Sequence, residues 1–184
     1  MFTGSGSLVF LYLTALFKMQ RFISRLPSHS HTIFDPRNRY ITHLQYTVLS
    51  PEDRDSVFIY PTMFYVSLSN EKLPAMRLAR WTKKVDIFSK TLLVFPICIG
   101  SHWFLIVVIK PGLVTSPDKT NIKGKPLLVV RDSLGLSQDS AVKLIREYLT
   151  QEWRTSPSSG GQTFQFSAKH MRTIRPQMVR ISTL

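Results

Sequence analysis

The sequence predicts an α+β fold in which helices flank a small, mainly antiparallel sheet. Two patterns lead to this prediction. Apolar residues recur at three- and four-residue steps near both ends of the chain, as in helices that bury one face. Between them lie β-branched and aromatic runs bounded by Gly and Pro, which are typical of strands. Because helices come first, strands follow, and a helix and a final strand close the order, the pattern favours the α+β class.

Length and composition indicate one globular domain. The chain has 184 residues, of which 43% are hydrophobic and 11% aromatic, unlike a disordered protein. Lys and Arg number 24 against 11 Asp and Glu, a net charge of +13. Such an excess points to an acidic partner or to plain solvation. Because the basic residues are interleaved with apolar ones, we favour an acidic protein face or solvation over nucleic-acid binding.

The first element expected is a helix over residues 8–26. Its apolar stripe comprises Leu8, Leu11, Tyr12, Ala15, Leu16 and Met19. The ten-residue apolar run 8–17 is too short to span a bilayer, and no Lys or Arg precedes it as in a signal peptide. We therefore expect a soluble protein that is not secreted and has no membrane partner. Residues 26–39, which contain two prolines, are expected to form a loop.

Two further helical patterns precede the strands. A helix beginning near Pro61 would place Phe64, Tyr65 and Leu68 on one face, since proline suits a first turn. The stretch 77–90 has apolar residues at helical or near-helical steps. These are Leu78, Trp81, Val85 and Phe88.

The period then changes to that of strands. Residues 91–100 and 102–110 predict two strands separated at Gly100-Ser101, and a third is expected over 127–135 after the polar turn region 113–126.

The last elements follow the third strand. Residues 137–153 form the clearest helical pattern, with Ser137 or Asp139 as the expected cap. Its apolar stripe comprises Ala141, Leu144, Ile145, Tyr148 and Leu149. A flexible loop is expected over 155–161 and a last strand over 163–171.

His102 is the residue that does not fit a buried strand. It opens one predicted strand, and Asp132 lies 30 residues later near the end of another. Adjacent strands could bring the imidazole and the carboxylate together, and a carboxylate that orients a histidine is part of many nucleophile–base–orienter sets. On spacing alone the favoured alternative is a structural hydrogen bond at the rim of the sheet.

A family resemblance bears on this choice. The segments "RWTKKVDIFSKTLLVFPICIGSHWFLIVVI", "LLVVRDSLG" and "IREYLTQEW" closely resemble the Ulp1/SENP family of SUMO-processing cysteine proteases, which have a papain-like fold. The best-matching core is 55–153, with weaker likeness over 8–54 and 162–177. The ending "EYLTQEW" is most similar to the SENP6/SENP7-like branch. The resemblance implies that 1–184 is a single, partial Ulp1-type protease domain.

The resemblance also implies roles for individual residues. His102 would be the general base, Asp132 its orienter, and Gln177 the donor that stabilises the oxyanion. Trp103 would cover the Gly-Gly tail of the substrate, with Trp81 as a second substrate-binding candidate. The implied reaction is peptide or isopeptide hydrolysis after Gly-Gly. SUMO or another ubiquitin-like protein and its conjugates would be the partners. No cofactor or metal is implied, and the location would be nuclear or cytoplasmic.

The nucleophile is where the sequence departs from the family. The family's cysteine stands six positions after the glutamine, where this chain has Thr183, and residues 178–184 do not follow the family pattern. The single cysteine, Cys98, excludes a disulfide framework and is expected to be a small core residue in a reducing compartment. We therefore expect a domain truncated before its nucleophile and inactive as this chain.

Two alternatives to a protease remain open. One is a catalytically dead module that still binds SUMO. The other is a non-folding fragment produced by an isoform or by an error in the gene model. A basic nucleic-acid-binding module is more distant, since it would require steeply salt-dependent binding to DNA or RNA.

Overall fold

The computed structural model describes residues 50–70, 81–115 and 125–176, together with Arg39, Thr42, His43 and Tyr46. The helix predicted over 8–26 and the loop over 26–39 therefore fall almost wholly outside the described residues. Gln177, Thr183 and the tail 178–184 also lie outside them.

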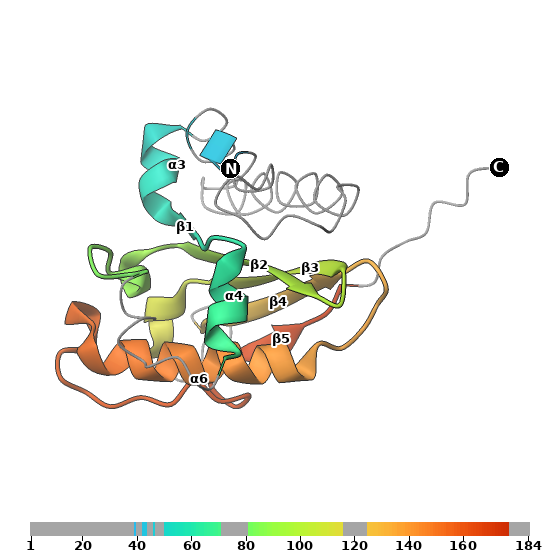
Figure 1. Ribbon diagram of the computed structural model, residues 1–184. Coiled ribbons are helices and arrows are strands. Elements are labelled where there is room, and N and C mark those ends of the chain that lie inside the picture. Colours follow the sequence, from blue (N-terminus) through green and yellow to red (C-terminus); the bar gives the residue numbers. More distant parts are fainter. Residues whose placement is uncertain are drawn as a thin grey trace, which may run out of the picture.

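A five-stranded mixed sheet forms the centre of the fold (Figure 1). In spatial order, which is also chain order, its strands are β1 Val57–Ile59, β2 Leu92–Ile99, β3 His102–Ile109, β4 Leu127–Asp132 and β5 Arg172–Ile174. The three long central strands are antiparallel, whereas the short strands β1 and β5 join them in parallel. The predicted antiparallel sheet is thus found in the centre, with parallel edges that the sequence pattern did not indicate.

Within the described ranges, all helices but one are short. They are α3 Pro51–Ser56, α4 Met63–Leu68, α6 Asp139–Thr155 and the 3-10 helices η2 Ile87–Ser89, η3 Pro111–Thr115 and η5 Pro157–Ser159. Figure 1 shows α6 running along one face of the sheet. Residues of α4 and α6 pack with one face of the central strands in the larger core cluster, which includes Phe64, Phe95, Ile106, Ile145 and Trp153.

Alternation along the strands separates the two faces of the sheet. In β3, Phe104, Ile106 and Val108 belong to the larger cluster on the α6 side. Trp103, Leu105 and Val107 belong to a second cluster, which also contains Val57, Ile59, Leu92, Val94 and Val129. Successive side chains of a strand point to opposite faces, so the second cluster lies on the face away from α6. This continuous burial explains why β2 and β3 are apolar at nearly every position.

Several sequence predictions are confirmed. The structure has strands at β2, β3 and β4, a helix with Phe64 and Tyr65 buried after Pro61, and a long helix ending near residue 153. The predicted loop over 155–161 contains η5, whose Ser156 and Ser158 hydroxyls donate to Asp86. In the described part of the chain, no helix is both long enough and apolar enough to cross a membrane.

The helix predicted over 77–90 is wrong for its described part. Residues 81–84 form a turn and only η2 follows. The reason is Asp86, whose carboxylate accepts the N–H of Phe88 and thereby offers the backbone an alternative to helical bonding.

The last strand is also displaced from its predicted position. Residues 163–171 contain no strand, and pairing begins only at Arg172. The N–H of Phe166 donates to the Thr150 side chain, and the rings of Phe164 and Phe166 pack around Trp153. The alternating aromatic residues that suggested a strand therefore pack on the end of α6 instead.

Two smaller differences concern element ends. Neither Ser137 nor Asp139 is the N-cap of α6, because Gln138 occupies that position without a side-chain capping bond. The strand β1 was not predicted, since three residues are too few to show a period.

Candidate active site

A tight hairpin places His102 at the start of β3. Gly100 and Ser101 both have positive φ angles (54° and 69°), which suits the two-residue turn that joins right-twisted strands. Ile99 therefore pairs directly with His102. The imidazole lies at the rim of the sheet, with its side chain 22% exposed.

Asp132 comes to the same place from β4. It is the last residue of that strand and pairs with Phe104, two residues beyond His102. Residues two apart in a strand share a face, and so do directly opposed residues in neighbouring strands. Both side chains therefore lie on the α6 side of the sheet, in diagonal positions. Only 2% of the Asp132 side chain is exposed.

The two side chains form one hydrogen bond, 2.7 Å from His102 Nε2 to Asp132 Oδ1. The same Oδ1 accepts the Leu134 N–H at 2.7 Å, and Oδ2 accepts the side-chain amide of Gln138 at 2.6 Å. A carboxylate only accepts, so Nε2 donates and the lone pair of a neutral imidazole falls on Nδ1. Among the described residues, none hydrogen bonds with Nδ1. This arrangement orients His102 so that Nδ1 can accept a proton from a group placed next to it.

Of the donors to Asp132, sequence reasoning identified only His102. Gln138 has a left-handed backbone (φ 54°), which is uncommon for a residue other than glycine. Nothing in its residue type or spacing signals that conformation. The bond from the Leu134 N–H belongs to a turn in which the Asp132 side chain accepts from the backbone two residues later. Aspartate commonly forms such turns.

The two tryptophans predicted to bind substrate lie apart from this hydrogen bond. Trp103 is 4% exposed and packs in the second cluster, on the face away from α6. Trp81 is 37% exposed and contacts the Phe64 ring edge-on at 6.2 Å. Their roles toward a substrate stay predictions, and so does that of Gln177, which follows the last described residue.

Cys98 faces away from His102. Its partner across the hairpin is Trp103, and it packs against the second cluster. The thiol and the imidazole therefore lie on opposite faces of the sheet.

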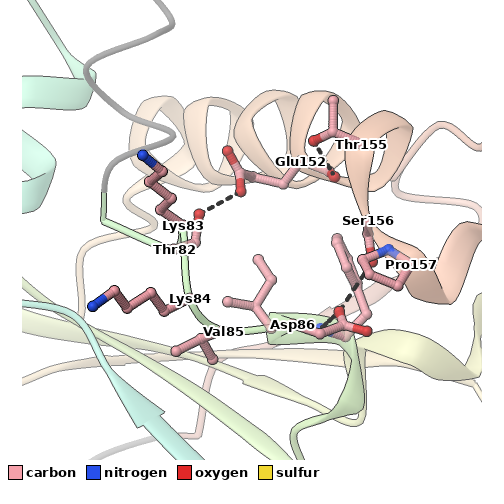
Figure 2. Close-up of a pocket in the computed structure, with 11 residues that line it drawn as sticks. Thr82, Lys83, Lys84, Val85, Asp86, Glu152, Thr155, Ser156 and Pro157 are labelled. Atoms are coloured by element: carbon pink, nitrogen blue, oxygen red, sulfur yellow. Dashed lines mark hydrogen bonds between the residues drawn. The ribbon is translucent and has the colours of Figure 1, made fainter.

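The structure also contains a cavity of about 530 Å³ between residues 82–88 and residues 152–157 (Figure 2). Thr82 donates to Glu152 across it at 2.7 Å, while Lys83 and Lys84 point away from it. Burial raises the pKa of Glu152 above its ordinary value. The cavity is at the C-terminal end of α6, whereas Asp132 and Gln138 are at the other end, about 25 Å away for 17 residues at 1.5 Å each. It is therefore separate from the His102–Asp132 pair.

Comparison with known proteins gives a consistent picture. The model of the Ulp1 protease family, C-terminal catalytic domain, matches residues 30–178. "Probable ubiquitin-like-specific protease 2B" of Arabidopsis thaliana is 34% identical over 91 residues, covering 48% of this chain and 10% of that protein. "Probable ubiquitin-like-specific protease 2A" of the same plant is 28% identical over 150 residues, covering 76% and 18%. "Sentrin-specific protease 6" of Mus musculus is 33% identical over 87 residues, covering 40% and 8%.

A solved structure shares the fold. It is described as the crystal structure of the de-sumoylating protease and superposes with a TM-score of 0.55 at 19% identity, covering 91% of this chain and 55% of that one. The predicted α+β, papain-like fold is thereby confirmed. The chain spans less than a fifth of each of the three relatives above. Since the family model matches well over half of its residues, the chain belongs to the Ulp1 protease family.

Proposed function

We propose that this chain carries the general base and the orienting carboxylate of a SUMO- or ubiquitin-like-specific cysteine protease, which hydrolyses peptide or isopeptide bonds after Gly-Gly. The observation that carries the proposal is the 2.7 Å bond between His102 Nε2 and Asp132, in a member of this family. A purely structural hydrogen bond would give Nδ1 no role, whereas a general base needs this nitrogen to be open to the group whose proton it takes.

In the proposed reaction, Nδ1 of His102 takes the proton of a thiol, and the thiolate attacks the carbonyl carbon of the last glycine. Asp132 holds the ring and stabilises the imidazolium that forms. The imidazolium then gives its proton to the leaving amine as the carbon–nitrogen bond breaks. Water, deprotonated by the same imidazole, hydrolyses the thioester and frees the thiol. In this proposal the Gln177 amide donates to the oxyanion.

In this proposal the chain has no cysteine thiol next to Nδ1 of His102. Cys98 is the only cysteine in the sequence, and it packs on the opposite face of the sheet. We therefore propose that this chain, taken alone, binds a SUMO-type partner without cleaving it. The placement of Cys98 disfavours cleavage by this thiol, so binding without cleavage is the second candidate function.

The identity of the partner rests on the family. The net charge of +13 suits an acidic partner surface. The assignment to the SENP6/SENP7-like branch stays a prediction, because sentrin-specific proteases 6 and 5 are both 33% identical over their matched segments. Residence in the nucleus is likewise a proposal.

A covalent probe tests the missing thiol. The purified chain and its Cys98→Ala variant are incubated with SUMO bearing a C-terminal vinyl sulfone and with di-SUMO. We expect neither capture nor cleavage. Capture that is lost in Cys98→Ala would make Cys98 the nucleophile, and capture that survives would point to another group, with Thr183 the first to examine.

Titration with unmodified SUMO tests the partner. We expect the His102 side-chain NMR signals to shift on addition of SUMO that ends in Gly-Gly. The matched control is SUMO lacking those two glycines, which should bind more weakly and leave His102 unchanged. Equal responses to both proteins, or none to either, would remove the proposed tail-recognising role of this site.

A further inference from the structure

Gln138 has a backbone conformation that its residue type does not favour. Its φ and ψ angles are 54° and 34°, in the left-handed region where a β-carbon is crowded. It occupies the N-cap of α6, where a side chain normally satisfies a free N–H of the first turn, yet its side chain makes no capping bond. The position therefore gains nothing for the helix from having glutamine.

The glutamine side chain reaches Asp132 instead. Its amide Nε2 lies 2.6 Å from Oδ2, while Oδ1 of the same carboxylate binds His102 and the Leu134 N–H. Asp132 as a whole is 5% exposed. With one oxygen held by Gln138 and the other by two donors, the carboxylate cannot rotate without breaking a bond.

Arg175 holds the turn on both sides of Gln138. Its Nε donates to the Ser137 carbonyl at 2.9 Å, and its guanidinium also binds the Asp139 carboxylate. Arg175 follows directly after β5, so the segment leading toward Gln177 is joined to the turn before α6. A left-handed residue persists where surrounding contacts hold it, and these two contacts flank it.

We propose that Gln138 is a positioning residue, which fixes the Asp132 carboxylate and through it the ring and the tautomer of His102, and that Arg175 keeps Gln138 in place. The inference rests on the base role proposed for His102. It goes further by joining the β5 end to the histidine through contacts running from Arg175 to the Gln138 turn, Asp132 and His102. In the neutral ring the Nε2 proton points to Asp132, so the lone pair lies on Nδ1.

The test is ¹⁵N NMR of the histidine side chains in the full chain, with the His102 signals assigned by a His102→Gln variant. In the wild type we expect the proton on Nε2 and a resolved Nε2–H signal. Gln138→Met keeps a side chain of similar length and removes the donor. Gln138→Gly removes the donor and also relieves the left-handed backbone.

Both variants should lose the resolved Nε2–H signal and show exchange-averaged ring nitrogens. Gln138→Gly should melt at a higher temperature than Gln138→Met, because both variants lose the donor to Asp132 and only glycine relieves the left-handed backbone, which separates positioning from stability. Arg175→Ala should reduce the signal, whereas Arg172→Ala, a control at an exposed arginine of β5, should leave it unchanged. A wild-type His102 spectrum in either Gln138 variant, or a proton on Nδ1 in the wild type, would overturn the proposal.

This readout does not depend on catalysis or on SUMO. If the titration with SUMO fails while the Gln138 variants alter His102, the proposed function fails and the positioning role stands. If the tail of SUMO perturbs His102 while the Gln138 variants leave it unchanged, the reverse holds.

Discussion

At the residue scale, the Asp132 carboxylate is the point on which three donors converge. Removing it in Asp132→Ala leaves the His102, Leu134 and Gln138 donors without their acceptor. Unsatisfied polar groups cost about 1–3 kcal/mol when water cannot replace the partner. We expect the free energy of unfolding in urea to fall by about that amount in total, since His102 and Gln138 are partly exposed and regain some water.

The control for this prediction is the neighbouring residue. Ser133 is exposed, so Ser133→Ala should change the free energy of unfolding by no more than about 0.5 kcal/mol. Equal stability of the two variants would mean that the contacts around Asp132 contribute nothing to the fold.

The sequence predicted part of this site and could not predict the rest. Strand endings and spacing were enough to bring His102 and Asp132 together. The face of Trp103 was also available from the sequence, because a residue next to His102 in a strand must point to the other side. The Gln138 contact was not available, since it depends on a left-handed backbone in a residue that rarely adopts one.

At the element scale, α6 lies between two groups of polar side chains, the one around Asp132 and the one formed by Thr82, Asp86 and Glu152. Its first turn lies by Asp132, and its last turns meet the segment 81–89 through Thr82 and Glu152 and through Asp86 and Ser156. The buried hydroxyls of Tyr60 and Tyr148, the latter on α6, form a hydrogen bond of 3.1 Å. Desolvation raises the pKa of both phenols, so they stay neutral hydrogen-bonding groups.

Glu152 makes this end of α6 sensitive to pH. Burial raises the pKa of its carboxyl above the ordinary 4.5, so the folded state binds its proton more tightly than the unfolded state does. The protonated form therefore favours folding, and stability from this group declines as pH rises from about 4.5 through the higher folded pKa. Above the folded pKa the Glu152 carboxylate is charged while partly buried, which lowers the stability of the folded state.

We expect Glu152→Gln to remove this decline. The amide keeps an oxygen for the Thr82 hydroxyl and carries no charge. The difference in free energy of unfolding, variant minus wild type, should grow with pH across that window and then level off, as measured by urea denaturation at several pH values. Glu147→Gln, at a carboxylate whose side chain is 55% exposed, is the matched control and should give no such rise. A pH-independent difference for Glu152→Gln would refute the burial effect.

At the scale of the whole molecule, apolar periodicity predicted the long elements and missed those set by single contacts. β2, β3, β4 and α6 bury many side chains each, so their periods are visible in the sequence. The segment 81–89 and the true position of β5 depend instead on Asp86 and on aromatic rings around Trp153. The first is a side-chain-to-backbone bond between residues two apart and the second joins rings far apart in the chain, and neither produces an apolar period in the sequence.

The same core bears on whether the chain folds by itself. The larger cluster joins α4, α6 and the sheet, and several of its side chains, among them Ile106 and Trp153, have no exposed surface. Close packing makes a core sensitive to the loss of a few methyl groups. A loosely collapsed fragment would not show that sensitivity, because its side chains have no fixed neighbours.

Ile106→Ala distinguishes these cases. In a packed core it should lower the free energy of unfolding by about 2–5 kcal/mol, with a single cooperative transition in near-ultraviolet circular dichroism and an unchanged dependence on urea. Leu134→Ala removes a side chain of similar size at a residue that is 64% exposed, and should cost no more than about 0.5 kcal/mol. Similar small effects of both substitutions, without a cooperative transition, would support the non-folding alternative. A large difference would mean that the sheet and α6 fold together, which the contacts from Arg175 through Gln138 to His102 require.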